Sequence, residues 1–386
     1  MTDERIRKAI EAIEDSCNEE AISILEPIAK DLDPDPDALV YLGLAYIQAE
    51  RPVDAVKVLR QAQEMVEDHC VLALFLGRAL RSLGKYEEAE DELRRAIELE
   101  PEDPEAWIEL GKLLYSKGNY GEAARIMDEA IILFPEDLSL RGTLALALYK
   151  LGDFTQATNE WANLHKLDPD LMAAMTNLAY LLLLQDRTNE ALPLVEEAYK
   201  RDSEDYRALV LKGMVSLTAD EKDKAKIYFE KILENHSDNV EALSRLAVIE
   251  YENGDAEKCT ALLDYAEKQI NSEQECWRGL CFAYSRLGLQ DKHIECLKNW
   301  TEQDPGAAAP WVSLAIEYDR EGRKDLALGA WRKAMELRGY IRIHCANCRQ
   351  SIKFEITNAS AFEPYEPQKC DNCGTKIEMP IGLLAL

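Results

Sequence analysis

The chain lacks any long uninterrupted run of apolar residues. Its most apolar stretch, residues 178–184, is far shorter than the roughly 18 residues that a membrane-spanning helix needs. Residues 1–5 are mostly charged or polar, and no apolar signal-peptide core follows them. We therefore expect no membrane insertion, and the cytoplasm is the default location.

Basic residues are scarce relative to acidic ones. The 45 Lys and Arg residues face 73 Asp and Glu residues, which gives a formal charge of −28. A surface of this sign disfavours nucleic-acid backbones and anionic membranes, because both require a positive stripe. We expect neither to be a partner.

Signs of catalysis and of secretion are also missing. We find no phosphate-binding loop, dinucleotide-binding glycine motif, nucleophile elbow or zincin helix, and we therefore expect no enzyme activity. Six of the ten cysteines are scattered along the chain and do not form the disulfide framework of a small secreted domain. The other four form two pairs near the C-terminus.

A small residue recurs every 34 positions along most of the chain. The first series is Ala9, Gly43, Gly77, Gly111, Ala145, Ala179, Gly213, Ala247, Cys281 and Ala315. The second series lies 12 residues behind it and comprises Ala21, Ala55, Ala89, Ala123, Ala157, Ala191, Ala225, Cys259, His293 and Ala327. A strict period of this length predicts a stacked repeat protein.

Each unit reads as two antiparallel helices. In residues 104–137, Pro104 occupies the first helical position, Gly118 breaks the helix, and Pro135 ends the second helix. Two helices at short interaxial distance cannot hold large side chains at their crossing point. The small residues therefore indicate where the helices of a pair touch.

This pattern resembles the tetratricopeptide repeat (TPR) in length, in helix-turn-helix order and in its signature positions. The resemblance covers residues 2–341 as ten units that start at residues 2, 36, 70, 104, 138, 172, 206, 240, 274 and 308. It implies an all-α, right-handed α-solenoid superhelix with a concave groove that binds protein segments. We expect a second domain, a small β-rich zinc ribbon, at residues 342–386.

In this arrangement the second, fifth, sixth, ninth and twelfth positions of each unit face the groove. The residues that we expect to bind a client there are Tyr41, Leu44, Phe75, Arg78, Lys112, Tyr115, Leu146, Tyr149, Asn177, Tyr180, Leu211 and Met214. The groove is thus predicted to be apolar with scattered cations, and the acidic charge to lie mostly on outer faces and loops.

An apolar strip of this kind favours an amphipathic helix or extended peptide that carries apolar anchors and some acidic groups. The other interpretation is that tight winding buries these residues against one another. The sequence identifies neither the client nor the oligomeric state.

Two C-x2-C pairs near the C-terminus predict a metal site. Cys345, Cys348, Cys370 and Cys373 can supply four thiolates to one tetrahedral ion, and Gly374 follows the last cysteine as in zinc ribbons. Spacing alone also fits rubredoxin-type iron, but neither pair carries the proline of that family, so zinc is expected. Four protein ligands leave no open position, which makes the metal structural.

The leading hypothesis is a non-catalytic adaptor in which the ribbon caps the last repeat. Repeats followed by a tetracysteine module are distantly similar to lipopolysaccharide assembly protein B-type adaptors, although this chain shows no membrane helix. The alternative is a regulatory protein that uses the tetracysteine site as a redox or metal sensor. A further cluster, formed by Cys259, Cys281 and His293 in small-residue positions, is typical of core packing, and His293 is bulky for its position.

Overall fold

The computed structural model describes residues 2–31, 34–270, 277–344, 347, 351–355, 368–369 and 372–377. These residues fall into two compact units, Met1–Thr143 and Leu144–Leu386. We describe each unit by itself. The described residues form twenty helices and four short strands.

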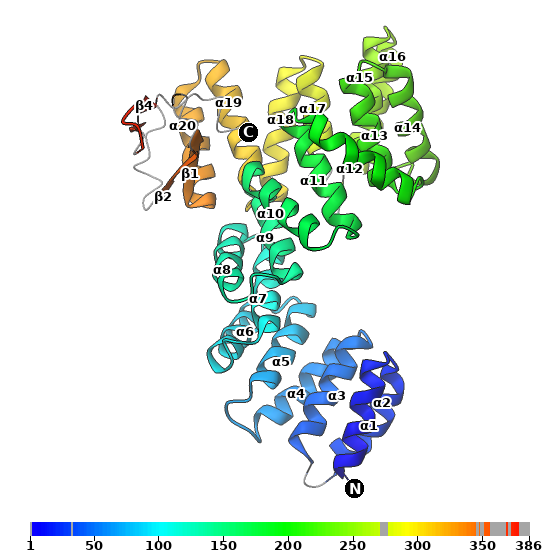
Figure 1. The fold of residues 1–386 in the computed structure, drawn as a ribbon, viewed down its shortest axis with the longest axis vertical. Coiled ribbons are helices and arrows are strands. Elements are labelled where there is room, and N and C mark those ends of the chain that lie inside the picture. Colours follow the sequence, from blue (N-terminus) through cyan, green and yellow to red (C-terminus); the bar gives the residue numbers. More distant parts are fainter. Residues whose placement is uncertain are drawn as a thin grey trace. The chain divides into compact units, whose positions relative to one another are not determined.

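The first unit consists of antiparallel helix pairs (Figure 1). Its helices are α1 (Thr2–Glu14), α2 (Asn18–Ala29), α3 (Pro36–Gln48), α4 (Pro52–Gln63), α5 (Cys70–Ser82), α6 (Tyr86–Leu99), α7 (Pro104–Ser116) and α8 (Tyr120–Leu133). Helix α9 (Leu138–Lys150) crosses the boundary between the units.

The second unit continues the helix pairs and ends in strands. Its helices are α10 (Phe154–Leu167), α11 (Met172–Leu184), α12 (Thr188–Arg201), α13 (Tyr206–Thr218), α14 (Lys222–Asn235), α15 (Val240–Glu252), α16 (Ala256–Gln269), α17 (Trp277–Arg286), α18 (Gln290–Gln303), α19 (Ala308–Arg320) and α20 (Lys324–Arg338). Strand β1 (Tyr340–His344) pairs antiparallel with β2 (Ser351–Glu355), and β3 (Gln368–Lys369) pairs antiparallel with β4 (Lys376–Ile377).

Local sequence explains where the helices begin and end. Asp103 accepts a hydrogen bond from the Glu105 backbone amide, and Pro104 takes the first helical position of α7. Between the helices of a pair, the chain reverses through a residue in the left-handed region, such as Gly118 at φ +77°. Asp186 and Asp220 occupy the equivalent positions in the sixth and seventh repeats at φ +57° and +58°.

The two series of small residues lie in the core of the helix pairs. The alanines of both series are fully buried, and each glycine of the first series faces a large side chain of its partner helix. A Cβ atom on Gly213 would lie 2.5 Å from Cζ of Phe229, and one on Gly43 would lie 2.5 Å from the Leu59 side chain. The small residues therefore make room for a large residue of the second helix.

No helix in the described part of the chain is both long enough and apolar enough to cross a bilayer. The helices of the repeats are instead amphipathic or buried within their unit, and the C-terminal strands follow α20 after the single residue Gly339.

Replacing Gly213 by alanine tests the close approach of α13 and α14. The new Cβ must displace the fully buried ring of Phe229, so we expect a loss of about 1–3 kcal/mol of stability. Gly329→Ala in α20 is the matched control, because nothing lies within 4 Å of its Cβ position and the change should add about 0.5–1 kcal/mol. Urea unfolding midpoints that shift alike in the two variants would contradict the close approach.

Candidate functional site

A hollow of about 250 Å³ lies on α11, α13 and the start of α15 in the second unit. The residues that line it are Thr176, Asn177, Tyr180, Tyr206, Arg207, Val210, Leu211, Asn239 and Glu241. Three residues expected in the groove, Asn177, Tyr180 and Leu211, therefore lie together. We call this hollow the inner pocket.

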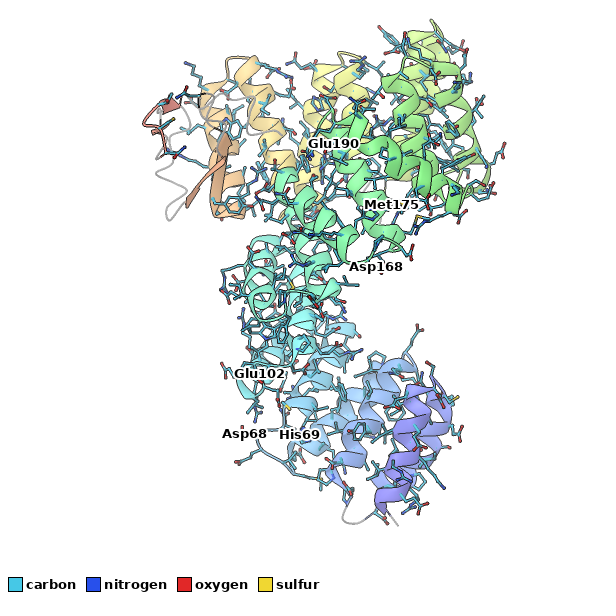
Figure 2. All side chains as sticks on the ribbon, in the orientation of Figure 1. Asp68, His69, Glu102, Asp168, Met175 and Glu190 are labelled. Carbon is cyan, nitrogen blue, oxygen red and sulfur yellow. The ribbon has the colours of Figure 1, made fainter. Side chains whose placement is uncertain are left out.

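Helix geometry and packing position these side chains. Asn177 and Tyr180 are three residues apart in α11 and therefore share a face of that helix. Met175, which Figure 2 labels, packs with Ala198 and Ala208 in a small buried cluster that joins α11, α12 and α13. Met175 directly precedes the lining residue Thr176, so this cluster adjoins the pocket.

The polar groups of the pocket differ in whether they already have partners. The side-chain Oδ1 of Asn239 accepts from the Ala242 backbone amide as the cap of α15, and Glu241 is paired with Arg245 at 2.8 Å. Within the described residues, the side-chain amide of half-buried Asn177 forms no hydrogen bond. It is therefore available as both a donor and an acceptor.

Apart from the carboxylate of Glu241, which is paired with Arg245, the pocket is lined by neutral groups and one exposed cation, Arg207. Burial raises the pKa of the Tyr180 hydroxyl well above its ordinary value, and the carboxylate of Glu241 adds to that effect, so Tyr180 stays protonated. At the rim, the guanidinium of Arg207 lies 5.6 Å from the ring centre of Tyr206. An apolar wall is supplied by Val210 and by Leu211, which is 2% exposed.

Other predicted groove residues of the second unit have different environments. Leu146 is 40% exposed, whereas Met214 is buried. Tyr149 contacts Phe154, with 5.8 Å between ring centres, and it also lies beneath the guanidinium of Arg278 at 4.8 Å. The Tyr149 ring is thus engaged by contacts within the unit.

The first unit has its own hollow beside α1 and α3. Glu4, Ile6, Arg7, Ile10, Asp35, Asp37 and Tyr41 line it. Of the predicted groove residues nearby, Leu44 is half-buried and Phe75 is buried. Tyr115 packs edge-to-face against Tyr120 with ring centres 5.0 Å apart.

The cations expected in the groove of the first unit are paired with carboxylates. Arg81 and Lys112 lie 2.9 Å and 3.0 Å from the oxygens of Glu109, and Arg78 lies 3.5 Å from Glu105. Burial would raise the pKa of Glu109, but Arg81 and Lys112 outweigh it and the pKa is lowered. Acidic side chains therefore occupy this face as well as the outer faces.

The sequence carries a signal for these two glutamates, which are not among the predicted groove residues. Glu105 and Glu109 hold the second and sixth positions of the fourth unit, and both positions face the predicted groove.

The predicted metal site lies mostly outside the described residues, which omit Cys345, Cys348 and Cys370. Cys373 is exposed and donates its thiol proton to Oγ1 of Thr375, 3.2 Å away. No cluster of three or more metal-ligating side chains occurs in the described part of the chain.

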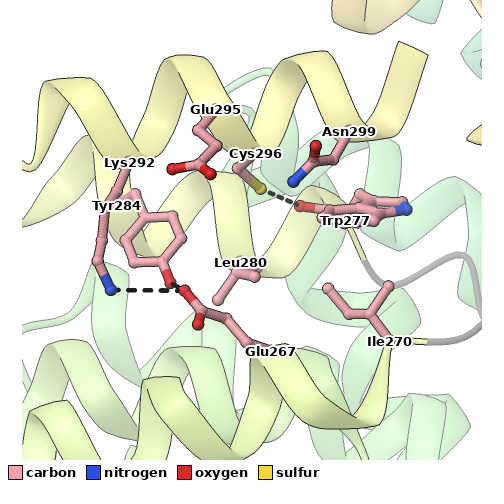
Figure 3. A pocket seen from close by; sticks show the side chains of 9 residues that line it. All are labelled: Glu267, Ile270, Trp277, Leu280, Tyr284, Lys292, Glu295, Cys296 and Asn299. Atoms are coloured by element: carbon pink, nitrogen blue, oxygen red, sulfur yellow. Dashed lines mark hydrogen bonds and ion pairs between the residues drawn. The ribbon is translucent and has the colours of Figure 1, made fainter. Parts of the chain in front are cut away.

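Cys296 of the ninth repeat is held as a protonated thiol. Cys296 lines a second hollow of about 300 Å³ in which Tyr284 donates a hydrogen bond to Glu267 (Figure 3). Burial, followed by the neighbouring Cys281, raises the pKa of the Cys296 thiol strongly. Because the thiolate is the reactive form, this protonated thiol is inert.

Comparisons with known proteins agree with this geometry. A tetratricopeptide repeat family model matches residues 76–137, 143–206 and 176–239, and a model for anaphase-promoting complex, cyclosome, subunit 3 matches residues 16–96. Human protein O-mannosyl-transferase TMTC3 is 36% identical over 99 residues. That alignment covers 24% of this chain, and this chain spans 11% of the length of the human protein.

Two solved structures match parts of this chain, and the first of them has a similar fold. The C-terminal part of a TPR repeat-containing protein from Cytophaga hutchinsonii has a TM-score of 0.51 at 18% identity, covering 62% of this chain and 99% of that one. A tetratricopeptide repeat protein from Parabacteroides merdae has a TM-score of 0.47 at 18% identity, covering 69% of this chain and 98% of that one.

Tetratricopeptide repeats are therefore present in this chain, and its helical array has the fold of a TPR solenoid. Repeats of this kind serve as scaffolds for interactions between proteins.

His293 gives the ninth repeat a measurable sensitivity to acid. Burial lowers its pKa, although Glu317 opposes this effect from 3.7 Å. Because the unfolded chain then takes up the proton first, stability should fall as the pH drops below about 6.5. We expect His293→Ala to reduce the difference between urea midpoints at about pH 7.5 and about pH 5.5.

The matched control is His236→Ala, because His236 is exposed at the end of α14. It should keep the pH dependence of the parent chain. An unchanged pH dependence in His293→Ala would show that His293 is not held neutral by burial.

Proposed function

We propose that this chain is a non-catalytic adaptor that binds a peptide segment of a client protein in the inner pocket. The observation that carries the proposal is the free amide of Asn177 beside Tyr180 and Leu211. An amide group can bond to both the N–H and the C=O of a peptide backbone. A peptide would in that way pair with both polar groups of the Asn177 side chain.

The remaining lining indicates the side chains that such a peptide carries. Val210 and Leu211 form a wall suited to an apolar anchor residue. Exposed Arg207 at the rim favours a nearby carboxylate, since Glu241 is already neutralised by Arg245. We infer an extended segment with an apolar anchor and an acidic neighbour, as the groove composition predicts.

Substitution of Asn177 tests this proposal. A peptide selected from a random dodecapeptide phage library against the full chain serves as the probe, and isothermal titration measures its affinity. We expect Asn177→Ala to weaken binding about tenfold, because the buried peptide groups then lose a hydrogen-bond partner.

The matched control is Asn189→Ala, which removes an exposed amide from α12, outside the pocket. It should leave the affinity unchanged. Equal affinity of the parent chain and a folded Asn177→Ala variant would exclude the inner pocket as the binding site.

We also propose that the two cysteine pairs hold a structural zinc ion. The first pair lies in sequence between the paired strands β1 and β2, and the second between β3 and β4. Asn347, from within the first pair, donates to Oγ1 of Thr375 at 3.1 Å, which supports a close approach of the two loops. Thiolates at such turns suit zinc, and the module would cap the last repeat.

Metal analysis tests this second part. We expect one zinc per chain, and we expect Cys373→Ser to lose it, because three thiolates bind more weakly than four. Removal of the metal with a chelator should speed hydrogen exchange first around Trp311 and Trp331 in the last repeat. A reduced, folded chain without stoichiometric metal would refute the site, and unchanged exchange would refute the cap.

A further inference from the structure

The turn between α9 and α10 differs from the equivalent turns of the other repeats. Its central residue, Gly152, is buried together with its neighbours Leu151 and Asp153. The residues at the same repeat position elsewhere are Ser16, Glu50, Gly84, Gly118, Asp186, Asp220, Gly254, Gly288 and Gly322. All of these are exposed except Gly118, which is half-buried.

The end of α20 covers this turn. The Nε atom of Arg338 donates to the backbone carbonyl of Leu151, although 187 residues separate them in sequence. A Cβ atom on Gly152 would lie 2.7 Å from a guanidinium nitrogen of Arg338 and 3.2 Å from Cβ of Ala309. Glycine is thus needed at residue 152 for this contact as well as for its positive φ.

The first residue of β1 adds a second hydrogen bond. The hydroxyl of Tyr340 donates to Oδ2 of Asp153 at 2.7 Å, and both side chains are buried. Asp153 also caps α10 by accepting from the Gln156 backbone amide. Gly339, in the left-handed conformation, ends α20 and directs the chain toward this bond.

An ion pair and an aromatic cluster flank these bonds. Lys150 lies 2.8 Å from Asp304 at the end of α18, and the Lys150 side chain is 6% exposed. The guanidinium of Arg278 lies 4.8 Å, 4.9 Å and 5.5 Å from the ring centres of Tyr149, Phe154 and Trp300. Six consecutive residues of the fifth hairpin therefore contact the ninth and tenth.

We propose that residues 338–340 form an intramolecular strap that docks on the α9–α10 turn and closes the second unit on itself. In the strap, the guanidinium of Arg338 donates to the backbone carbonyl of Leu151, and the hydroxyl of Tyr340 donates to the carboxylate of Asp153. When it releases, these two bonds to the turn are lost.

Hydrogen exchange of the full chain tests the docking without any client. In the double variant Arg338→Met with Tyr340→Phe, amides of residues 151–157 and 304–311 should exchange about tenfold faster, because two buried hydrogen bonds to the turn are lost. Amides of α13 and α14 should keep the parent rates. If the double variant does not fold, Tyr340→Phe alone replaces it in the experiment. We then expect hydrogen exchange at the same residues to be faster than in the parent chain, but by a smaller factor.

Tyr46→Phe is the matched control, since Tyr46 donates an equivalent hydrogen bond to Glu26 at 2.8 Å in the first unit. It should leave residues 151–157 at the parent rates. Unchanged exchange of these residues in the strap variants, or an equal acceleration throughout the second unit, would overturn the strap.

Discussion

The structure depends on close approach of the two helices in every repeat. At each glycine of the first series, a Cβ atom would lie within 3 Å of a large side chain of the second helix, and that side chain fills the space that the glycine leaves. Gly213 with Phe229 and Gly43 with Leu59 show this pairing directly. Because the period of 34 residues is kept without insertion, each hairpin presents the same faces to its neighbours.

The order of the repeats along the chain explains most helix–helix contacts, but it does not explain the contacts between the fifth hairpin and the ninth and tenth hairpins of the second unit. Within the array, each helix packs mainly on the helices next to it in sequence. The α9–α10 turn instead contacts residues more than 150 positions away. Such contacts add positional constraints that a simple stack of hairpins does not have, and they bring charged groups such as Lys150 into the interior.

The helical array was predictable from sequence because its signals repeat. The spacing of small residues, the helix-breaking glycines and the prolines that begin helices all act locally and point to the same architecture, and the all-helical TPR solenoid is confirmed. Neither the pairing of Glu109 with Arg81 and Lys112 nor the burial of Gly152 was predicted. The first requires comparison of inward positions in adjacent units, and the second depends on contacts with Ala309 and Arg338 of the tenth repeat, which no single repeat encodes.

A scan of the first small-residue series tests the central claim most directly. Each of its ten residues is replaced in turn by valine, and the urea midpoint of every variant is measured against valine at an exposed helix position. The account predicts that every substitution in the series lowers stability, most where the facing side chain is rigid, as with Phe229 opposite Gly213. Variants as stable as the parent chain would show that the helices do not meet at these residues.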